Sequence, residues 1–171
     1  SVGRPLPSVE MRIVDDTGRD VEAGEAGEIW IRGPSVFPGY FGKPEATERA
    51  FTGGWFRTGD TATLDADGYV RILGRTSVDI LKSGGYKLSA LEIEEALRQH
   101  PGIAEVAVVG IPDPRWGDRV TAAIVARPGH EGALTTEAVR AFAREHLAPY
   151  KLPQQVVLCA ELPRNSLGKV I

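Results

Sequence analysis

The sequence changes its local pattern abruptly within residues 69–94, and this change constrains the fold more than any other feature. The side chains of residues 69–73 alternate with the period of two that predicts a strand. Residues 74–77, Gly-Arg-Thr-Ser, end that pattern with a glycine and small polar groups, which is typical of a turn or linker. We therefore expect two parts of the chain to meet near Arg75.

A helix is expected to begin shortly after this break. Gly84 and Gly85 allow backbone conformations that are closed to residues with a side chain. Ser89 and Glu92 then form an S-x-x-E capping box ahead of apolar positions that start at Ile93. The stretch thus predicts, in order, a strand, a basic joint, a glycine pair that another group can approach closely, and a helix.

Composition excludes several classes of protein. A net charge of −3 gives no electrostatic case for binding nucleic acid or an anionic membrane. No apolar run approaches the roughly 18 residues that a membrane span needs. Cys159 is the only cysteine, so we expect no disulfide, no cysteine metal cluster and a reduced cytoplasmic or organelle-matrix setting, with the cytoplasm as the prediction. Because Ser1 is not a methionine and Ile171 ends within a motif, we expect a piece of a larger protein.

Three separated motifs resemble one enzyme family. Residues 74–94, GRTSVDILKSGGYKLSALEIE, resemble the hinge motif of the acyl-CoA synthetases, the adenylate-forming ligases that include luciferases and peptide-synthetase adenylation domains. GEIWIRGPSVFPGYFGKPEAT with GWFRTGD precedes this motif, and LPRNSLGKV ends the chain. Their order resembles the C-terminal part of that family, and the hinge motif is most similar to malonyl-CoA or methylmalonyl-CoA synthetases.

The fold is expected to be α+β, with a small β-barrel-like subdomain followed by a hinged α+β C-terminal domain. Residues 1–74 predict short strands and one or two helical turns, whereas residues 80–171 alternate helices with strands. The resemblance implies that 1–74 are the last subdomain of a large N-terminal domain, that 75–79 are the hinge, and that 80–171 are mobile. Strands are expected at 9–15, 27–33, 62–65, 69–73, 103–110, 120–126 and 155–159, and helices at 44–50, 89–100 and 136–147.

Asp60 and Arg75 are the candidate nucleotide-binding residues. A carboxylate can accept hydrogen bonds from the vicinal hydroxyls of a ribose, and its charge strengthens them. The alternative for Asp60 is an Asx turn before a strand, and the alternative for Arg75 is a solvated hinge arginine. The resemblance implies that both residues contact the ribose of ATP.

Lys169 is the candidate catalytic residue for joining a carboxylate to the α-phosphorus of ATP. Negative charge builds up between the two reactants, and a cation delivered there on a flexible stem stabilises it. The alternative is an ordinary solvated lysine. The resemblance, through Pro163, Arg164, Asn165 and Gly168, implies the catalytic role.

Lys82, Gly84, Gly85 and Lys87 are candidates for the second step, in which the thiol of CoA attacks the acyl-adenylate. Glycines allow a pantetheine arm to run close to the backbone, and the resemblance implies that a lysine meets the departing AMP. The alternative is a Gly-Gly hairpin flanked by solvated lysines.

The hinge is expected at residues 77–79. The family's motif has an aspartate or lysine two residues after the arginine, whereas this chain has Ser77 there and one extra residue before Asp79. Ser77 or Val78 is therefore the expected pivot, and Asp79 matches the second acidic residue of the motif.

ATP, Mg²⁺ and CoA are the substrates and cofactors that the resemblance implies, with a short acid such as malonate. The three histidines share no ligand spacing, so no metal site is expected. The phosphate loop and acyl pocket of the family are expected in a missing N-terminal domain, and the 171 residues alone are expected to be inactive. Two alternatives stay open: an adenylation enzyme that loads the pantetheine of a carrier protein, and a non-catalytic binding module.

Overall fold

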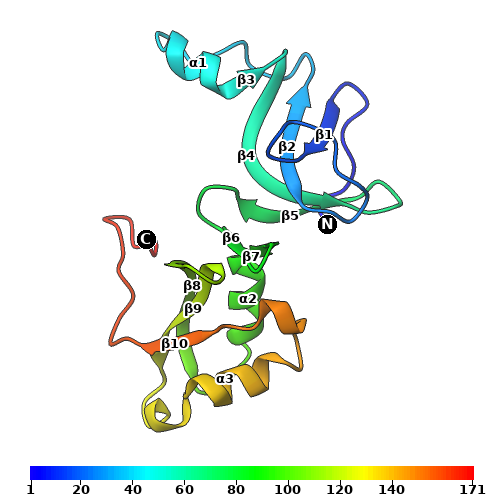
Figure 1. The fold of residues 1–171 in the computed structure, drawn as a ribbon. Helices are drawn as coiled ribbons and strands as arrows, with labels where there is room; N and C mark the ends of the chain where they lie inside the picture. The colour runs from blue at the N-terminus through cyan, green and yellow to red at the C-terminus, as the bar shows by residue number, and fades with distance from the viewer. The chain divides into compact units, whose positions relative to one another are not determined.

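The computed structural model describes residues 1–171, which contacts divide into two compact units, Ser1–Val78 and Asp79–Ile171. Each unit has its own sheet and its own hydrophobic core (Figure 1). The fold is α+β, as predicted. None of its helices combines the length and the apolar character that crossing a membrane requires.

The first unit is an antiparallel sheet of five strands. Its elements are β1 (Glu10–Val14), β2 (Gly27–Arg32), α1 (Pro44–Ala50), β3 (Phe51–Thr52), β4 (Trp55–Leu64) and β5 (Val70–Arg75). The strand order is β1-β2-β4-β3, and β5 pairs with β4. Figure 1 shows β4 as a long curved strand, and register shifts on both sides of β4 account for the bend because a bulge increases local twist.

The length of β4 differs from the prediction. The sequence predicted a strand only over 62–65, whereas the structure extends it back to Trp55. The φ of +72° at Gly59 is accommodated inside the strand next to the shift in register. The buried cluster of this unit comprises Ile13, Ile29, Ala62 and Val70, one residue from each of the strands β1, β2, β4 and β5.

The second unit is a mixed sheet with two helices. Its elements are β6 (Ile80–Ser83), β7 (Tyr86–Ser89), α2 (Ala90–Leu97), β8 (Ile103–Asp113), β9 (Gly117–Ala126), η1 (Glu131–Ala133), α3 (Thr136–Ala143), η2 (Pro149–Lys151) and β10 (Gln155–Leu158). The strand order is β10-β9-β6-β7, with β8 antiparallel to β9 and β10 parallel to it. The β8–β9 pair is thus the longest strand pairing of this unit, and β10 and β6 both pair with β9.

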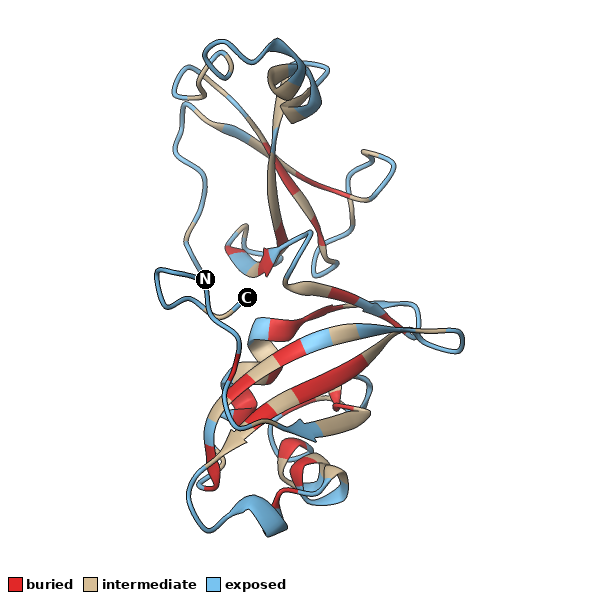
Figure 2. Ribbon diagram, turned by 90° about the vertical axis from the view of Figure 1, so that its left-hand side faces the viewer, coloured by how far each residue is buried: buried red, intermediate tan, exposed pale blue.

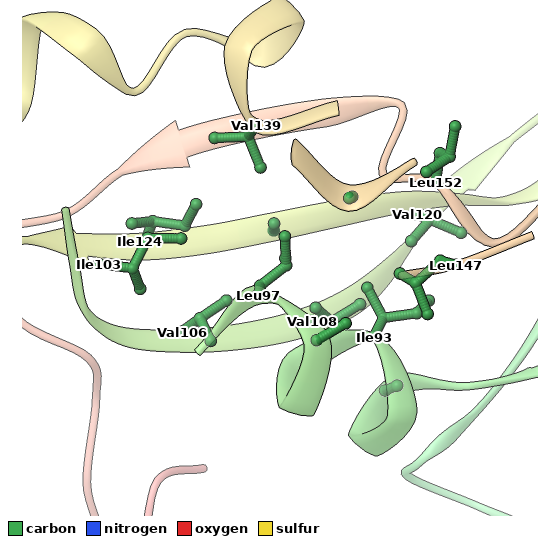
Figure 3. Close-up of a cluster of buried hydrophobic side chains, with 14 of the residues drawn as sticks. Ile93, Leu97, Ile103, Val106, Val108, Val120, Ile124, Val139, Leu147 and Leu152 are labelled. Carbon is green, nitrogen blue, oxygen red and sulfur yellow. The ribbon is translucent and has the colours of Figure 1, made fainter. Parts of the chain in front are cut away.

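The main core lies between this sheet and its helices. Figure 3 shows Val106 and Val108 of β8 and Val120 and Ile124 of β9 among the side chains that pack with Ile93 from α2. Figure 2 shows how the buried residues follow these strands in alternation. Burying each such side chain contributes roughly 1.5–3 kcal/mol. This core gives the second unit a rigid frame for the loops at its rim.

The helices begin where expected and end early. Ser89 Oγ accepts the N–H of Glu92 at 3.2 Å, which bears out the predicted N-cap of α2. The helices expected to reach residues 100 and 147 end instead at Leu97 and Ala143. In both cases the chain tightens into a turn with hydrogen bonds over three residues, which satisfies the last carbonyls of the helix.

Candidate active site

Asp60 and Arg75 are register partners on β4 and β5. Arg75 Nε lies 3.2 Å from Asp60 Oδ1, and Arg75 Nη1 donates to the carbonyl oxygen of Thr58 at 3.0 Å. The N–H of Asp60 donates to Thr58 Oγ1 at 3.1 Å. The Asx-turn alternative is wrong, because Asp60 lies inside β4 and not before a strand. The pair presents a partly exposed carboxylate beside a guanidinium.

Glu28 supports this pair from β2, and the sequence analysis missed it. Its Oε1 accepts the N–H of Gly59 at 3.2 Å, and its Oε2 pairs with Arg57 Nη2 at 3.1 Å. A Cβ on Gly59 would lie 3.7 Å from Arg75 Nη1, so the glycine brings the backbone close to the guanidinium. Glu28 reaches Gly59 only because β2 pairs with β4 in this register, and the sequence of the motif around Asp60 gives no information on that pairing.

The predicted hinge lies between two anchored residues. Thr76 donates its N–H to the carbonyl oxygen of Gly59 at 2.9 Å within the first unit. The carbonyl oxygen of Asp79 accepts the N–H of Ala90 at 2.8 Å within the second unit. The boundary between the compact units follows residue 78, and residues 77–78 are exposed. Residues 77–78 thus form a very short exposed segment between these two bonded residues.

Gly84 and Gly85 form the two-residue turn of the β6–β7 hairpin. Their φ angles are +59° and +85°, and positive values at both positions are typical of a tight hairpin turn. Lys82 and Lys87 are register partners in the same hairpin. A Cβ on Gly85 would meet nothing within 4 Å, so open space lies beside this turn. The hairpin that the sequence analysis left open as an alternative is therefore formed, and a ligand can still approach it.

The turn between β8 and β9 packs against this hairpin. The N–H of Gly84 donates to the carbonyl oxygen of Trp116 at 2.8 Å. Asp113 accepts the N–H groups of Arg115 and Trp116 and pairs with Arg119 at 2.6 Å. These bonds, with that from Arg119 first, lower the pKa of Asp113 and keep its carboxylate charged. The turn is therefore internally braced.

A cavity of about 180 Å³ adjoins the glycine turn. Trp116 and the stacked rings of Tyr86 and Tyr150, whose centroids are 4.5 Å apart, line it with an edge of Gly84. The ring of Trp116 lies beside Gly84, where a Cβ would come within 3.4 Å of it. Trp116 thus packs beside Gly84 and also lines the cavity.

Lys169 lies in a tight loop near the end of the chain. The side-chain oxygen of Asn165 accepts the N–H of Lys169 at 3.0 Å, and the N–H of Asn165 donates to the carbonyl oxygen of Lys169 at 2.9 Å. Arg164 donates to the carbonyl oxygen of Gly168 and pairs with Glu105 on β8. The Lys169 side chain is exposed. The loop therefore presents an ammonium group on a braced backbone.

The Lys169 loop and the glycine turn are attached to opposite ends of β8. Glu105, which pairs with the loop, is eight positions before Asp113, which braces the turn beside the glycines. At roughly 3.3 Å per residue, these two anchor points are about 26 Å apart along the strand. The two loops are therefore anchored at separate points of the same strand.

The histidines do not form a metal centre. No group of three or more His, Cys, Asp or Glu side chains comes together in a way that could hold an ion. His100 and His146 instead pack against Phe142, with ring centroids at 4.8 and 4.9 Å. Burial, with a smaller contribution from the charge of His130, lowers the pKa of His100. These contacts are structural.

Two family models match the chain, and both describe one class of enzyme. The AMP-binding enzyme model matches residues 1–41, and the model of the AMP-binding enzyme C-terminal domain matches residues 92–169. The chain thus belongs to the AMP-binding, adenylate-forming enzyme family.

Individual relatives narrow the comparison. The chain is 48% identical over 191 residues to the mitochondrial malonate–CoA ligase of Homo sapiens, covering 99% of the chain and 33% of the relative. Among solved structures, O-succinylbenzoate-CoA synthetase from Bacillus subtilis with AMP matches with a TM-score of 0.81, 35% identity and coverage of 98% of this chain and 33% of that one. ATP-bound MatB from Rhodopseudomonas palustris matches with a TM-score of 0.78, 38% identity and coverage of 98% and 33%. The chain therefore spans about a third of the length of these relatives.

Proposed function

We propose that this chain acts as the C-terminal third of an AMP-forming acid–thiol ligase that makes an acyl-CoA from malonate or a similar short dicarboxylic acid. The observation that carries the proposal is the 48% identity to a malonate–CoA ligase over 99% of the chain. The Asp60–Arg75 pair and the exposed Lys169 fall within the motifs on which the resemblance rests. ATP and CoA would be substrates of the complete enzyme.

In the first half-reaction, an oxygen of the substrate carboxylate attacks the α-phosphorus of ATP. The bond between that phosphorus and the bridging oxygen breaks, and pyrophosphate leaves. Asp60 accepts a hydrogen bond from a ribose hydroxyl, and Arg75 lies beside the same sugar. The Lys169 ammonium group stabilises the charge that develops between the carboxylate and the phosphate.

In the second half-reaction, the sulfur of CoA attacks the carbonyl carbon of the acyl-adenylate. The carbon–oxygen bond to AMP breaks, the thiol proton passes to solvent, and AMP leaves with its negative charge. The open side of Gly85 accommodates the pantetheine arm. Lys82 or Lys87 meets the departing phosphate.

Movement of the second unit about residues 77–79 would serve both steps. The Lys169 loop and the glycine turn are anchored about 26 Å apart along β8, at roughly 3.3 Å per residue, and a rotation would let each in turn face a fixed nucleotide. Hinges are a few residues that absorb a large backbone change, and the exposed residues 77–78 between Thr76 and Asp79 suit this role.

Mg²⁺ would enter as the counter-ion of ATP and not as a resident metal. No cluster of three potential ligands occurs in this chain, so none of its residues is assigned to the ion. We place the enzyme in the cytoplasm or in an organelle matrix. The human relative is mitochondrial by name, so fractionation of cells that express the complete enzyme would decide between the two.

The complete enzyme tests the proposal directly. With malonate, ATP and Mg²⁺ it should catalyse exchange of pyrophosphate into ATP, and with CoA it should release AMP and malonyl-CoA. The 171 residues alone should do neither. A complete enzyme with no acid-dependent pyrophosphate exchange across a panel of short acids would contradict the proposal.

Two competing functions give different results. An enzyme that loads a carrier protein would form the adenylate but transfer the acyl group to carrier-bound pantetheine in preference to free CoA. A non-catalytic module would show no protection of Asp60 and Arg75 by ATP in footprinting of the complete protein. Protection together with CoA-dependent AMP release supports the ligase.

A further inference from the structure

The turn that joins β8 and β9 holds the β6–β7 hairpin at three points. Asp118 Oδ2 accepts the backbone N–H of Lys82 at 2.7 Å. The carbonyl oxygen of Trp116 accepts the N–H of Gly84 at 2.8 Å. Ser83 and Gly117 are register partners between these two bonds. Residues 116–118 therefore hold the backbone of residues 82–84, which is the strand segment that enters the glycine turn.

Two glycines make room for this contact. A Cβ on Gly110 would lie 2.8 Å from Asp118 Cγ and 2.9 Å from its Cβ. A Cβ on Gly117 would lie 2.8 Å from the carbonyl oxygen of Lys82, and Gly117 has a φ of +80°. Real Cβ atoms do not approach other atoms so closely, so either substitution must displace the hairpin or the turn. The contact between Asp118 and Lys82 therefore requires a glycine at both position 110 and position 117.

The turn that carries Asp118 is itself fixed. Asp113 accepts the N–H groups of Arg115 and Trp116 at 2.9 and 3.2 Å and pairs with Arg119. The turn continues directly into the long β8–β9 pair. The Asp118 carboxylate, held by this turn, can therefore fix the position of β6, which is a strand of only four residues.

We infer that Asp118 is a positioning residue for the thioester half-reaction. It sets the backbone of Lys82, and through it the approach to the Gly84–Gly85 turn, without touching the substrate. This inference rests on the proposed function, in which that turn and its flanking lysines receive the pantetheine arm and the departing AMP. The Lys169 loop is braced by Glu105 at the other end of β8, so the adenylation step does not depend on Asp118.

The test compares four variants of the complete enzyme in the separate half-reactions. Asp118→Ala removes the acceptor, Asp118→Asn keeps an oxygen of the same shape, and Gly110→Ala pushes the carboxylate aside without deleting it. Gly132→Ala is the matched control, because its Cβ would meet nothing within 4 Å. Pyrophosphate exchange measures adenylation, and addition of CoA to preformed enzyme-bound acyl-adenylate measures thioester formation in a single turnover.

Asp118→Ala and Gly110→Ala should slow thioester formation by roughly tenfold to a hundredfold, the range expected for losing a hydrogen bond to a charged group. Adenylation should stay within about twofold of the parent enzyme, which corresponds to a negligible change in barrier. Gly132→Ala should resemble the parent in both steps, and Asp118→Asn, which keeps the acceptor oxygen but not its charge, should slow thioester formation less than Asp118→Ala does. Equal loss of both half-reactions, or no loss of either, in Asp118→Ala overturns the inference.

Hydrogen exchange gives a readout that does not depend on activity. Peptides that cover residues 80–89 should exchange faster in Asp118→Ala and Gly110→Ala than in the parent, and not in Gly132→Ala. Unchanged exchange in Gly110→Ala would also overturn the inference, even where Asp118→Ala folds poorly. A parent enzyme inactive in both half-reactions would instead count against the proposed function, so the two failures are distinguishable.

Discussion

Arg75 Nε lies 3.2 Å from Asp60 Oδ1, which joins a guanidinium on β5 to a carboxylate on β4 at the point where the two residues are register partners. The arginine side chain is 63% exposed, and an exposed ion pair contributes only about 0–1 kcal/mol to stability. Stability alone is therefore a weak reason for this pair, and bonds to Thr58 hold the backbone of Asp60 and the guanidinium of Arg75. The arrangement is compatible with the ligand-binding role proposed above.

Asp60→Asn should weaken ATP binding and leave the fold intact. The amide keeps an acceptor oxygen but removes the charge, and a hydrogen bond to a charged group is worth about 1 kcal/mol more than a neutral one, or roughly fivefold in affinity. The KM for ATP in pyrophosphate exchange should rise by this factor, with a melting temperature close to that of the parent. Asp20→Asn is the control, because Asp20 forms a comparable exposed pair with Arg12 in the same unit. Equal effects of the two substitutions would argue for a purely structural Asp60.

Lys169→Ala should abolish adenylation and spare the thioester step. The substitution removes the ammonium group but keeps the N–H that donates to Asn165, so the loop retains its backbone bond. Asn165→Ala keeps the ammonium group and loosens the loop, and it should give a smaller loss in the same half-reaction. Single-turnover assays of both steps check this, and loss of thioester formation in Lys169→Ala would contradict the assigned role.

Ser77→Pro should slow one half-reaction selectively. Proline fixes its own φ and restricts the preceding residue, so a pivot at this position loses part of its range. A tenfold effect corresponds to about 1.4 kcal/mol on the barrier of the step that needs the rotation. Val78→Pro, on the other residue of the exposed segment, identifies the pivot by comparison. Normal rates of both half-reactions in both variants would exclude this hinge position.

Ile93→Ala should destabilise the second unit by about 2–5 kcal/mol, because a fully buried side chain leaves a cavity. Leu91 lies on the same helix and is 43% exposed. Leu91→Ala is therefore the matched control, with an expected loss below about 1 kcal/mol. Urea unfolding monitored by circular dichroism measures both. Equal losses would mean that α2 does not pack with the face described here.

Stability should fall as the pH drops below about 6.5, the usual pKa of histidine, partly because of His100. Burial lowers the pKa of His100 in the folded state, so the unfolded chain takes up a proton first. The folded state also uses His100 Nδ1 to accept the N–H of Gly102 at 3.0 Å, which requires the unprotonated nitrogen. Urea midpoints at about pH 7.5 and 5.5 should differ less in His100→Asn than in the parent. Gln99→Asn, which changes no titratable group at the neighbouring exposed position, should keep the full difference.

The sequence predicted those features that depend on neighbouring residues. The S-x-x-E box at Ser89 gave the start of α2 correctly, and the strand expected at 103–110 lies within β8. The β6–β7 hairpin was only an alternative, because four residues are too few to show a period. The strand expected at 62–65 was too short, because tertiary pairing carries β4 back through Gly59 to Trp55.

The candidate site shows the same division. The motifs supplied Asp60, Arg75 and Lys169, but not the residues that hold them. Glu105 lies 59 positions before its partner Arg164, and Asp118 lies 36 positions after Lys82. No local pattern marks such contacts, because they arise only when β8 and β9 pair along their whole length and bring their ends to the two loops.

The length of the β8–β9 pair sets the distance between the anchor of the Lys169 loop at Glu105 and the support of the glycine turn at Asp113. Deleting one residue from each strand would shorten it by about 3.3 Å and turn the intervening side chains to the opposite face, replacing buried Val108 with Val109 in the core. Only paired changes of two residues preserve the packing, so the spacing can be altered only in steps of about 6.6 Å. The distance between the anchor of the Lys169 loop and the anchor of the glycine turn can therefore change only in coarse increments.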